Sequence, residues 1–484
     1  MKFRLSIILF FLAGGFTSCR EELLSPIPQT SISDVVAFET PERTLATVNG
    51  MYAGSKVGQI YGGRYLVYQD VRGEEFINET ANGVTNLQTW NFTLTSGTNE
   101  VQNFWGAAYA AINRINVVLQ GLEKSPVADA LKNQYRGEAR FLRAMMYHTL
   151  VTLYARPFAD GNGSKPGVVI YTEPQVSGGD NKKARSTVGE VYNLIIEDLN
   201  FAEANLPASY SSQYLNVTRA HRNSAIAFKT RVYLYMGKYA EVITEGNKIV
   251  SATAPFTAPS GVQHRLESSV TGVFGTGGQT LENILSFPFT SLDLPGTQNS
   301  LNSYYSPGSS TACPTCSGSG EYSLNTGANG IVADAGWTTT DTRRTNFVQV
   351  IGTKTFFRKW NDNTNSVQAI RYAEVMLNLA EALARTNALD ARAIALLNAV
   401  RKRSDASTTL VPFTQAESIS MILKERRIEL LGEGFRSRDL LRLMSPIPSK
   451  GTVATLAPID AQYIWPIPLS ELVVNTIIEQ NAGY

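Results

Sequence analysis

Amphipathic helical periodicity recurs in separate blocks along the chain, and most of these blocks come in pairs. In one block, Phe104, Ala108 and Ala111 lie at spacings that place them on one helical face. Thr187, followed three residues later by Glu190, is a typical helix start. The predicted helices span residues 38–52, 103–122, 133–154, 187–205, 223–235, 239–251, 370–385, 390–403, 416–431 and 435–444. Because stacked helix pairs bury a continuous core, the chain is predicted to be mostly α, as a tetratricopeptide-like superhelix.

A loop-rich insertion interrupts the helical blocks between about residues 252 and 368. Gly, Ser, Thr, Pro and Asn accumulate in it, as at 272–278 and 306–320, and apolar runs are short. Long irregular segments inside a helical protein usually carry function, because rigid elements on either side can position them. We therefore expect this insertion to be functional rather than a passive connection.

The first nineteen residues have the order of a bacterial lipoprotein signal. Lys2 and Arg4 precede a short apolar run at 5–12, and small residues then lead into Cys19. The run is too short to span a bilayer as a mature helix. Cys19 is therefore the predicted site of lipidation, after removal of the residues before it.

This signal divides the chain into three predicted parts. Residues 1–18 form the signal peptide, residues 19–36 form a lipidated tether, and residues 37–484 form the helical domain. Acyl chains anchor a protein without a spanning helix. We therefore expect the protein to contact the membrane through its lipid anchor only.

The composition argues against several classes of function. The charges nearly cancel, with 43 Lys+Arg against 41 Asp+Glu, so no strongly basic balance points to nucleic acid. Only 3 Cys and 3 His occur, which disfavours a metal site, and no cofactor motif is present. The chain also lacks the motifs of a serine hydrolase, a nucleotide-binding loop or a zinc protease. We therefore expect a protein that is not an enzyme.

The most charged stretch, residues 425–439, has two readings. Glu425 and Glu429 fall on one helical face and could form a carboxylate pair for acid–base chemistry. Arginines alternate with these acids at three- and four-residue spacings, which favours ion pairs between helices. Neighbouring arginines would also lower the pKa values of both carboxyls, whereas a glycosidase acid needs a raised pKa. The ion-pair network is the favoured interpretation.

Cys313 and Cys316 have the spacing of a redox motif. Their flanks are a Gly- and Ser-rich loop with no helix following, and a helix is what would activate a thiol. Outside the cell, a local disulfide that stiffens the loop is favoured over two free thiols.

Candidate ligand-binding residues lie in loops rich in amide, carboxylate and aromatic side chains. A sugar ring offers a C–H face that packs on aromatic rings, and hydroxyls that bond to polar side chains. The candidates are Asp70, Arg72, Asn78, Trp90, Asn91, Asn302, Tyr304, Tyr305 and Trp337. For any one of them core packing is an equal alternative, and Trp105 and Trp465 are assigned to packing.

Five phrases in the same order make the chain similar to the SusD/RagB family of bacterial outer-membrane lipoproteins. These are Gly137–Ala144, Arg371–Ala382, Leu397–Arg403, Glu425–Leu430, and the end of the chain with Trp465–Pro468 and Gln480–Tyr484. The resemblance covers essentially the whole chain.

This resemblance implies a cell-surface nutrient-binding lipoprotein of the outer membrane, with a tetratricopeptide-like domain and a variable loop region. Members bind oligosaccharides and cover a SusC-like TonB-dependent transporter, and some bind peptides. The expected ligand is an oligosaccharide. The alternatives are a RagB-like peptide-uptake lipoprotein and a non-catalytic protein-interaction scaffold.

Overall fold

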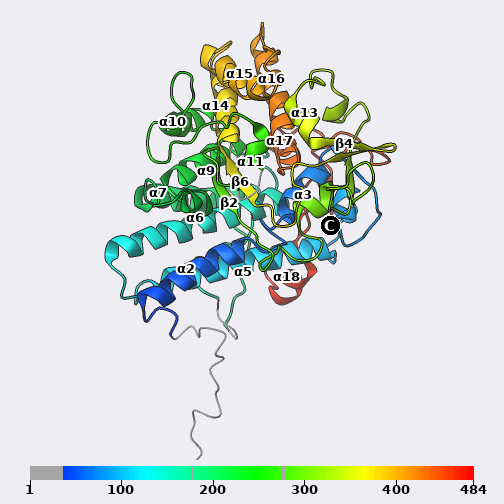
Figure 1. Cartoon of the computed structure of the whole chain (residues 1–484). Coiled ribbons are helices and arrows are strands. Elements are labelled where there is room, and N and C mark those ends of the chain that lie inside the picture. Colours follow the sequence, from blue (N-terminus) through cyan, green and yellow to red (C-terminus); the bar gives the residue numbers. More distant parts are fainter. Residues whose placement is uncertain (1–35, 176–178, 275–277) are drawn as a thin grey trace, which may run out of the picture.

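The computed structural model describes residues 36–175, 179–274 and 278–484 (Figure 1). The predicted signal peptide at 1–18 and the lipidation site Cys19 lie outside the described residues, as does nearly all of the predicted tether. Within the described ranges, no helix combines the length and the apolar character needed to cross a membrane.

All ten helices expected from periodicity form, with ends shifted by a few residues. They are α2 (Pro41–Ser55), α5 (Asn99–Gly121), α6 (Asp129–Tyr154), α7 (Val188–Asn205), α9 (Arg222–Tyr235), α10 (Tyr239–Ile249), α14 (Tyr372–Thr386), α15 (Ala391–Ser404), α16 (Gln415–Glu429) and α17 (Arg436–Arg442). Periodicity missed α3 (Arg64–Arg72), which is only 9 residues long and buries its polar side chains together with its apolar ones. It also missed the short helices, among them α8 (Gln213–Thr218) and α18 (Leu469–Val474).

Local signals in the sequence set two of these helix boundaries. The Thr187 hydroxyl accepts a hydrogen bond from the Glu190 amide at 3.2 Å, and the Glu190 carboxylate accepts the Thr187 amide at 2.7 Å. This reciprocal pair caps the start of α7. Gly237 has a φ of +70° between α9 and α10, a conformation that glycine adopts without a steric penalty.

The long helices stack in chain order. Helix α5 packs on α6, α6 on α7, α7 on α9 and α9 on α10. Helix α10 then packs on α14, and α14 packs on both α15 and α16. Figure 1 shows this series running from α5 and α6 at the bottom to α15 and α16 at the top. Each amphipathic face is thus covered by the next helix, as a superhelix of helix pairs requires.

Short strands tie the loop-rich insertion back to other parts of the chain. Strand β1 (Phe76–Asn78) pairs antiparallel with β3 (Tyr322–Leu324), and β2 (Asn283–Phe287) pairs antiparallel with β6 (Val367–Arg371). Strands β4 (Val348–Ile351) and β5 (Lys354–Phe357) form a hairpin. The remaining short helices are α4 (Leu87–Trp90), α11 (Val270–Val273), α12 (Leu301–Tyr305) and α13 (Thr342–Phe347).

Buried ion pairs join the last helices to the insertion. The Glu429 carboxylate on α16 lies 2.8 Å from Arg343, 3.0 Å from Arg371 and 2.5 Å from Arg403. Glu425, one turn earlier, lies 2.6 Å from Arg343. One carboxylate therefore connects α16 with α13, with the end of β6 and with α15.

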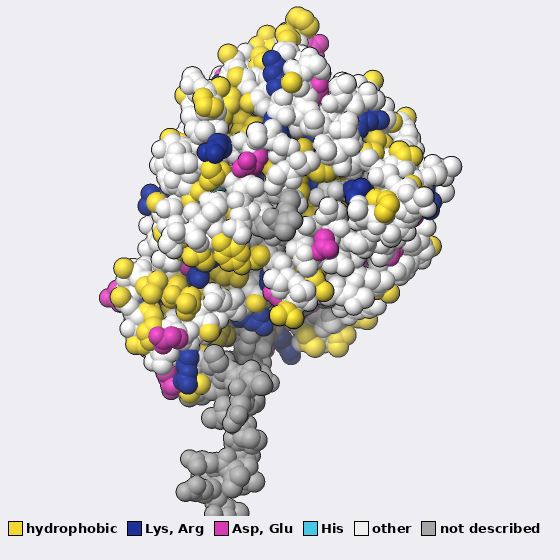
Figure 2. Space-filling model, in the orientation of Figure 1, with side chains coloured by type: hydrophobic (Ala, Val, Ile, Leu, Met, Phe, Trp, Pro, Cys, Tyr) yellow, Lys and Arg dark blue, Asp and Glu magenta, His cyan; other side chains and the backbone are white. Residues whose placement is uncertain are grey.

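The predicted interpretation of residues 425–439 as an ion-pair network is therefore correct. Burial by itself would raise the pKa of Glu429, but Arg403, Arg371 and Arg343 hold that pKa well below its ordinary value. A carboxyl with a lowered pKa stays ionised and does not act as a general acid at neutral pH. On the face seen in Figure 2 the remaining charged side chains are scattered, without a patch of one sign.

We expect Glu429→Gln to destabilise the fold by about 3–5 kcal/mol, because it removes the charge shared by three buried arginines. Urea denaturation monitored by circular dichroism measures the change. The matched control is Glu39→Gln, since Glu39 pairs with Arg43 at 2.7 Å on an exposed surface. The control should lose less than about 1 kcal/mol. Equal losses in the two variants would contradict a structural role for the network.

Candidate ligand-binding site

Helix α12 separates the predicted site residues of the insertion into an inner and an outer group. Its Tyr304 and Tyr305 point into the core and are 0% exposed. Ser300, at its N-cap, accepts a hydrogen bond from the Ser303 amide at 3.2 Å. Ser300 and Asn302 line a hollow beside the helix. The inner rings thus hold the helix in place, and the outer polar side chains form the wall of a site.

Tyr305 is the centre of the inner group. Its hydroxyl donates to Asp70 Oδ2 at 2.9 Å, and the Gly434 amide donates to the same oxygen at 2.9 Å. Its ring stacks on Phe76 with a centroid distance of 4.7 Å. Tyr305 therefore connects α12 to α3, to β1 and to the turn before α17.

The other predicted aromatic and charged residues also serve packing. Trp90 is 8% exposed, and its indole nitrogen donates to the Phe76 carbonyl at 2.8 Å. Arg72 is 1% exposed and donates to the Tyr463 carbonyl at 2.7 Å. Trp337 is buried with the Arg344 guanidinium 5.6 Å from its ring.

These positions correct the expectation that loops present Trp90, Tyr304, Tyr305 and Trp337 to a ligand. Their rings are buried, and Asp70 and Arg72 are buried with them, so a ligand at the surface of this structure does not reach these side chains. The sequence could not show this, because the partners that bury the rings lie far away in the chain.

Asn78 and Asn91 lie in half-buried positions near β1 and α4. Asn78 Oδ1 accepts the Ala81 amide at 2.8 Å, and Asn91 Oδ1 accepts the Thr93 hydroxyl at 2.6 Å. Both side chains stabilise turns. Their contact with a ligand stays a prediction.

Asn302 is the predicted residue that reaches the hollow beside α12. Its Nδ2 donates to Asn363 Oδ1 and to Ser317 Oγ, each at 3.2 Å. Its Oδ1 is buried and accepts no hydrogen bond in the described part of the chain. An unpaired buried carbonyl oxygen costs free energy unless a donor reaches it. Asn302 is itself 1% exposed, so only a small group that enters the hollow, whose volume is about 10 Å³, would supply such a donor.

The rest of the hollow combines polar and aromatic groups. Asp362 and Asn363 are exposed, Asn365 is half-buried, and all three contribute amide or carboxylate oxygens. The rings of Phe289 and Trp360 close the inner side of the hollow, but they are buried, at 7% and 1% exposed. Sequence analysis missed these residues, although the polar run at 361–365 just before β6 was a signal for a turn with hydrogen-bonding side chains.

Cys313 and Cys316 form the local disulfide that the sequence favours over two free thiols, and it lies in the loop next to the hollow. Ser317 directly follows this loop and donates to the Asn361 carbonyl at 3.0 Å. Arg358 reaches the loop through Thr315 at 3.2 Å. The cross-linked loop therefore packs against one wall of the hollow.

Two buried carboxyls beneath this region have raised pKa values. Burial raises the pKa of Asp70 to about 8, although the hydrogen bonds from Tyr305 and Gly434 oppose the shift. Burial raises the pKa of Glu100 to about 7, against the hydrogen bonds that it accepts from Thr89. Neither carboxyl lines the hollow, so both belong to the frame that supports it.

Two family models match the chain. One is described as starch-binding associating with outer membrane and matches residues 33–234, and the other is described as the SusD family and matches residues 265–455. The chain is also 25% identical to SusD-like protein P38 of Formosa agariphila, over 99% of this chain and 98% of that protein.

Solved structures share the same architecture. A SusD superfamily protein from Bacteroides fragilis superimposes with a TM-score of 0.80 at 31% identity, over 92% of this chain and all of that chain (100%). A protein described as a laminarin-binding SusD-like protein has a TM-score of 0.75 at 24% identity, over 92% of this chain and 100% of that chain. These matches confirm the predicted mostly α fold.

Replacing Asp70 by Asn tests the buried frame. In the unfolded chain Asp70 ionises near pH 3.8, whereas in the folded protein it keeps its proton up to about pH 8. The stability contributed by this group is therefore complete below pH 3.8 and is lost as the pH rises to about 8. Relative to wild type, Asp70→Asn should gain up to about 1.4 kcal/mol of unfolding free energy per pH unit across this interval.

Urea denaturation at a series of pH values measures this gain, which should level off above about pH 8. Asp129→Asn is the control, because the Asp129 side chain is 96% exposed. If the Asp70→Asn and wild-type profiles run parallel from pH 4 to 9, the Asp70 carboxyl does not carry the raised pKa.

Proposed function

Because the chain belongs to the SusD family, we propose that it is a cell-surface lipoprotein that captures oligosaccharides without cleaving them and delivers them to a SusC-like TonB-dependent transporter. The family match over residues 33–234 carries the description of starch-binding proteins associated with the outer membrane. The finer steps of the proposal are the oligosaccharide ligand, the lipid anchor at Cys19 and the transporter partner.

The observation that carries the ligand proposal is the hollow beside α12. At its mouth Asp362 and Asn363 are exposed, and beneath them lie the unpaired oxygen of the buried Asn302 and the buried rings of Phe289 and Trp360. The hollow has a volume of about 10 Å³, so a sugar would lie on the polar surface at its mouth and place at most one hydroxyl inside. Sugar hydroxyls both donate and accept hydrogen bonds, so a wall of amides and a carboxylate suits them. The likeness to a laminarin-binding protein supports a glucan as the first ligand to test.

The proposed lack of catalysis agrees with the state of the acidic residues. The carboxylates clustered on α16 are paired with arginines inside the core, away from the hollow. A glycosidase mechanism needs two carboxyl groups that flank the bond to be cleaved. Asp362 is a single exposed carboxylate at the hollow, and it accepts hydrogen bonds from the Thr364 amide and hydroxyl.

Weak binding at the hollow would suffice for uptake. A lipid tether and a bound transporter keep the site close to the place of entry, which raises the effective concentration of captured ligand. Reversible binding also lets the ligand leave toward the transporter. A tight site would slow this release.

We expect Asn363→Ala and Asp362→Ala each to weaken oligosaccharide binding about tenfold, the effect of losing about 1.4 kcal/mol of hydrogen bonding. Isothermal calorimetry with laminarin-derived and starch-derived oligosaccharides and a peptide pool measures the affinity. Both residues are exposed, so the substitutions should leave the fold intact. The matched control is Asn247→Ala, which alters an exposed Asn on α10, away from the hollow.

If peptides bind and oligosaccharides do not, the proposed ligand class is wrong. If Asp362→Ala, Asn363→Ala and Asn247→Ala bind with equal affinity, the hollow beside α12 is not the binding site. Mass spectrometry of the recovered sugars should show intact oligosaccharides, and cleavage products would contradict a purely binding role.

Substituting Cys19→Ser in the full-length chain should abolish incorporation of labelled palmitate and shift the protein from the outer-membrane fraction to the soluble fraction. Acyl chains supply the membrane affinity, and no described helix replaces them. Cys313→Ser is the control, because Cys313 belongs to the disulfide loop. If the wild-type chain incorporates no labelled palmitate, the proposed lipid anchor is wrong.

A TonB-dependent transporter should co-purify with the wild-type chain from solubilised membranes. If no transporter co-purifies, the proposed partner is wrong.

A further inference from the structure

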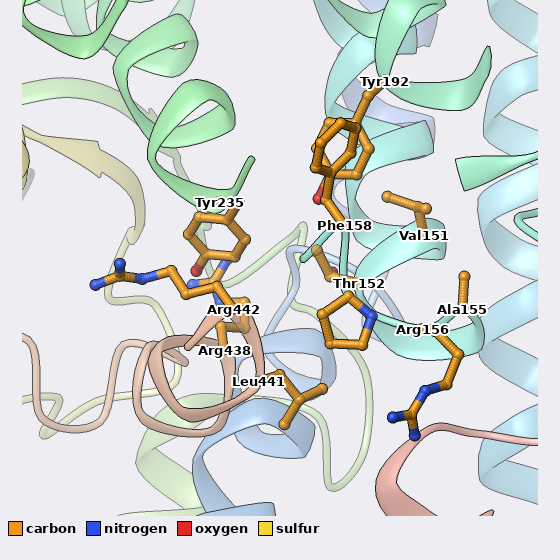
Figure 3. A pocket seen from close by; sticks show the side chains of 11 residues that line it. Val151, Thr152, Ala155, Arg156, Phe158, Tyr192, Tyr235, Arg438, Leu441 and Arg442 are labelled. Carbon is orange, nitrogen blue, oxygen red and sulfur yellow. The ribbon is translucent and has the colours of Figure 1, made fainter. Parts of the chain in front are cut away.

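A second pocket, with a volume of about 20 Å³, lies where four helices meet. It is lined by the end of α6 with the residues that follow it, by Tyr192 of α7, by Tyr235 of α9, and by Arg438 and Arg442 of α17 (Figure 3). Figure 3 shows Tyr235 and the α17 arginines on one side, with Phe158 and Tyr192 across from them. The pocket therefore joins the first half of the chain to the second.

Arg438 is the buried cation of this pocket. The residue is 3% exposed, and its guanidinium lies 4.4 Å from the ring centroid of Phe435 and 5.4 Å from that of Tyr65. Its Nε donates to the Gly434 carbonyl and its Nη1 donates to the Tyr65 hydroxyl at 3.3 Å. These two bonds leave Nη2 for a further acceptor. Rings and neutral oxygens thus surround a full positive charge.

Arg438 has no carboxylate partner within 4.0 Å among the residues that the structure describes. The acids around it are already paired: Glu374 with Arg231 at 2.6 Å, Asp439 with Arg426 at 3.0 Å, and Glu381 with Arg442 at 2.6 Å. The other two arginines of the pocket do have acids, since Arg442 also bonds Asp439 at 2.8 Å and Arg156 bonds Asp160 at 2.6 Å.

A buried charge without a counter-ion is costly, because the protein interior screens and solvates it poorly. The free-energy cost of burying the Arg438 charge is larger here because a second cation, Arg231, is close. Arg231 shares the Phe435 ring with Arg438, at 5.2 Å from the centroid. The local excess of positive charge favours an anion from solution.

Tyr235 supplies an independent sign of a missing ligand. It is 4% exposed, and its hydroxyl is buried without a hydrogen-bond partner among the described residues. The same ring lies 5.9 Å from the Arg438 guanidinium carbon. A buried hydroxyl normally finds an acceptor. An unpaired donor next to an unpaired cation is the arrangement that an anion satisfies.

We propose that this pocket binds a small oxyanion, with Arg438 as its counter-ion and the Tyr235 hydroxyl as a second donor. The planar guanidinium suits carboxylate and phosphate oxygens, because its N–H groups point in parallel directions. The apolar walls from Val151, Phe158 and Leu441 strengthen the charge interaction by excluding water. The bound anion ties α17 to α6, α7 and α9.

Calorimetry with sodium acetate and with sodium phosphate, at constant ionic strength and in a chloride background, tests the proposal on the full-length chain. One saturable site per chain is expected for at least one of the two anions. Tighter binding of acetate would indicate a carboxylate ligand, and tighter binding of phosphate would indicate a phosphate ligand. Arg438→Met should reduce the affinity at least about tenfold and Tyr235→Phe about fivefold, because each removes one donor to the anion.

The matched control is Tyr304→Phe, which removes another buried and unpartnered hydroxyl that does not line this pocket. It should bind the anion like wild type. If Arg438→Met does not fold, the comparison of anion affinities between Tyr235→Phe and Tyr304→Phe tests the proposal. No saturable binding of either anion to wild type, or equal affinities in Tyr235→Phe, Tyr304→Phe and wild type, would overturn the proposal.

Discussion

The buried carboxylate of Glu429 is the interaction on which the second half of the structure depends. Three arginines from three separate segments converge on it, at distances between 2.5 and 3.0 Å. Each of these charges is costly to bury alone, so the network is stable only when all its members are in place. It therefore fixes how α13 and β6 of the loop-rich insertion meet α15 and α16. Through β6, which pairs with β2, the same constraint extends into the insertion.

The insertion is held from its other end by neutral contacts. Tyr305 bonds Asp70 and stacks on Phe76, while β3 pairs with β1, so segments far apart in the chain form one frame. On the outer side of this frame, the amides and the carboxylate near α12 remain at the surface. A rigid base with polar loops above it suits reversible capture of a hydroxyl-rich ligand, because few side chains must be ordered on binding.

Unpaired buried polar atoms mark both proposed sites. Asn302 Oδ1 is a buried acceptor without a donor at the hollow. The Tyr235 hydroxyl is a buried donor without an acceptor, and it lies beside Arg438, which has no carboxylate partner among the described residues. The two sites therefore select opposite chemistry: hydroxyl groups of a sugar at one and a small oxyanion at the other. Around Glu429, in contrast, the carboxylate and its three arginines satisfy one another.

The sequence by itself determined the ten amphipathic helices and their pairing, because amphipathic spacing, the Thr187 cap and the Gly237 turn are local properties of the chain. It also determined the ion-pair character of 425–439, since acids and arginines alternate there at helical spacing. Only the tertiary structure decided which of the candidate side chains are buried and which stay near the surface. Trp90, Tyr304, Tyr305 and Trp337 looked exposed because no local apolar stripe absorbs them, yet distant segments such as β1 bury them. The lack of a partner for Arg438 is likewise a long-range property, since it depends on which acids the neighbouring arginines have already taken.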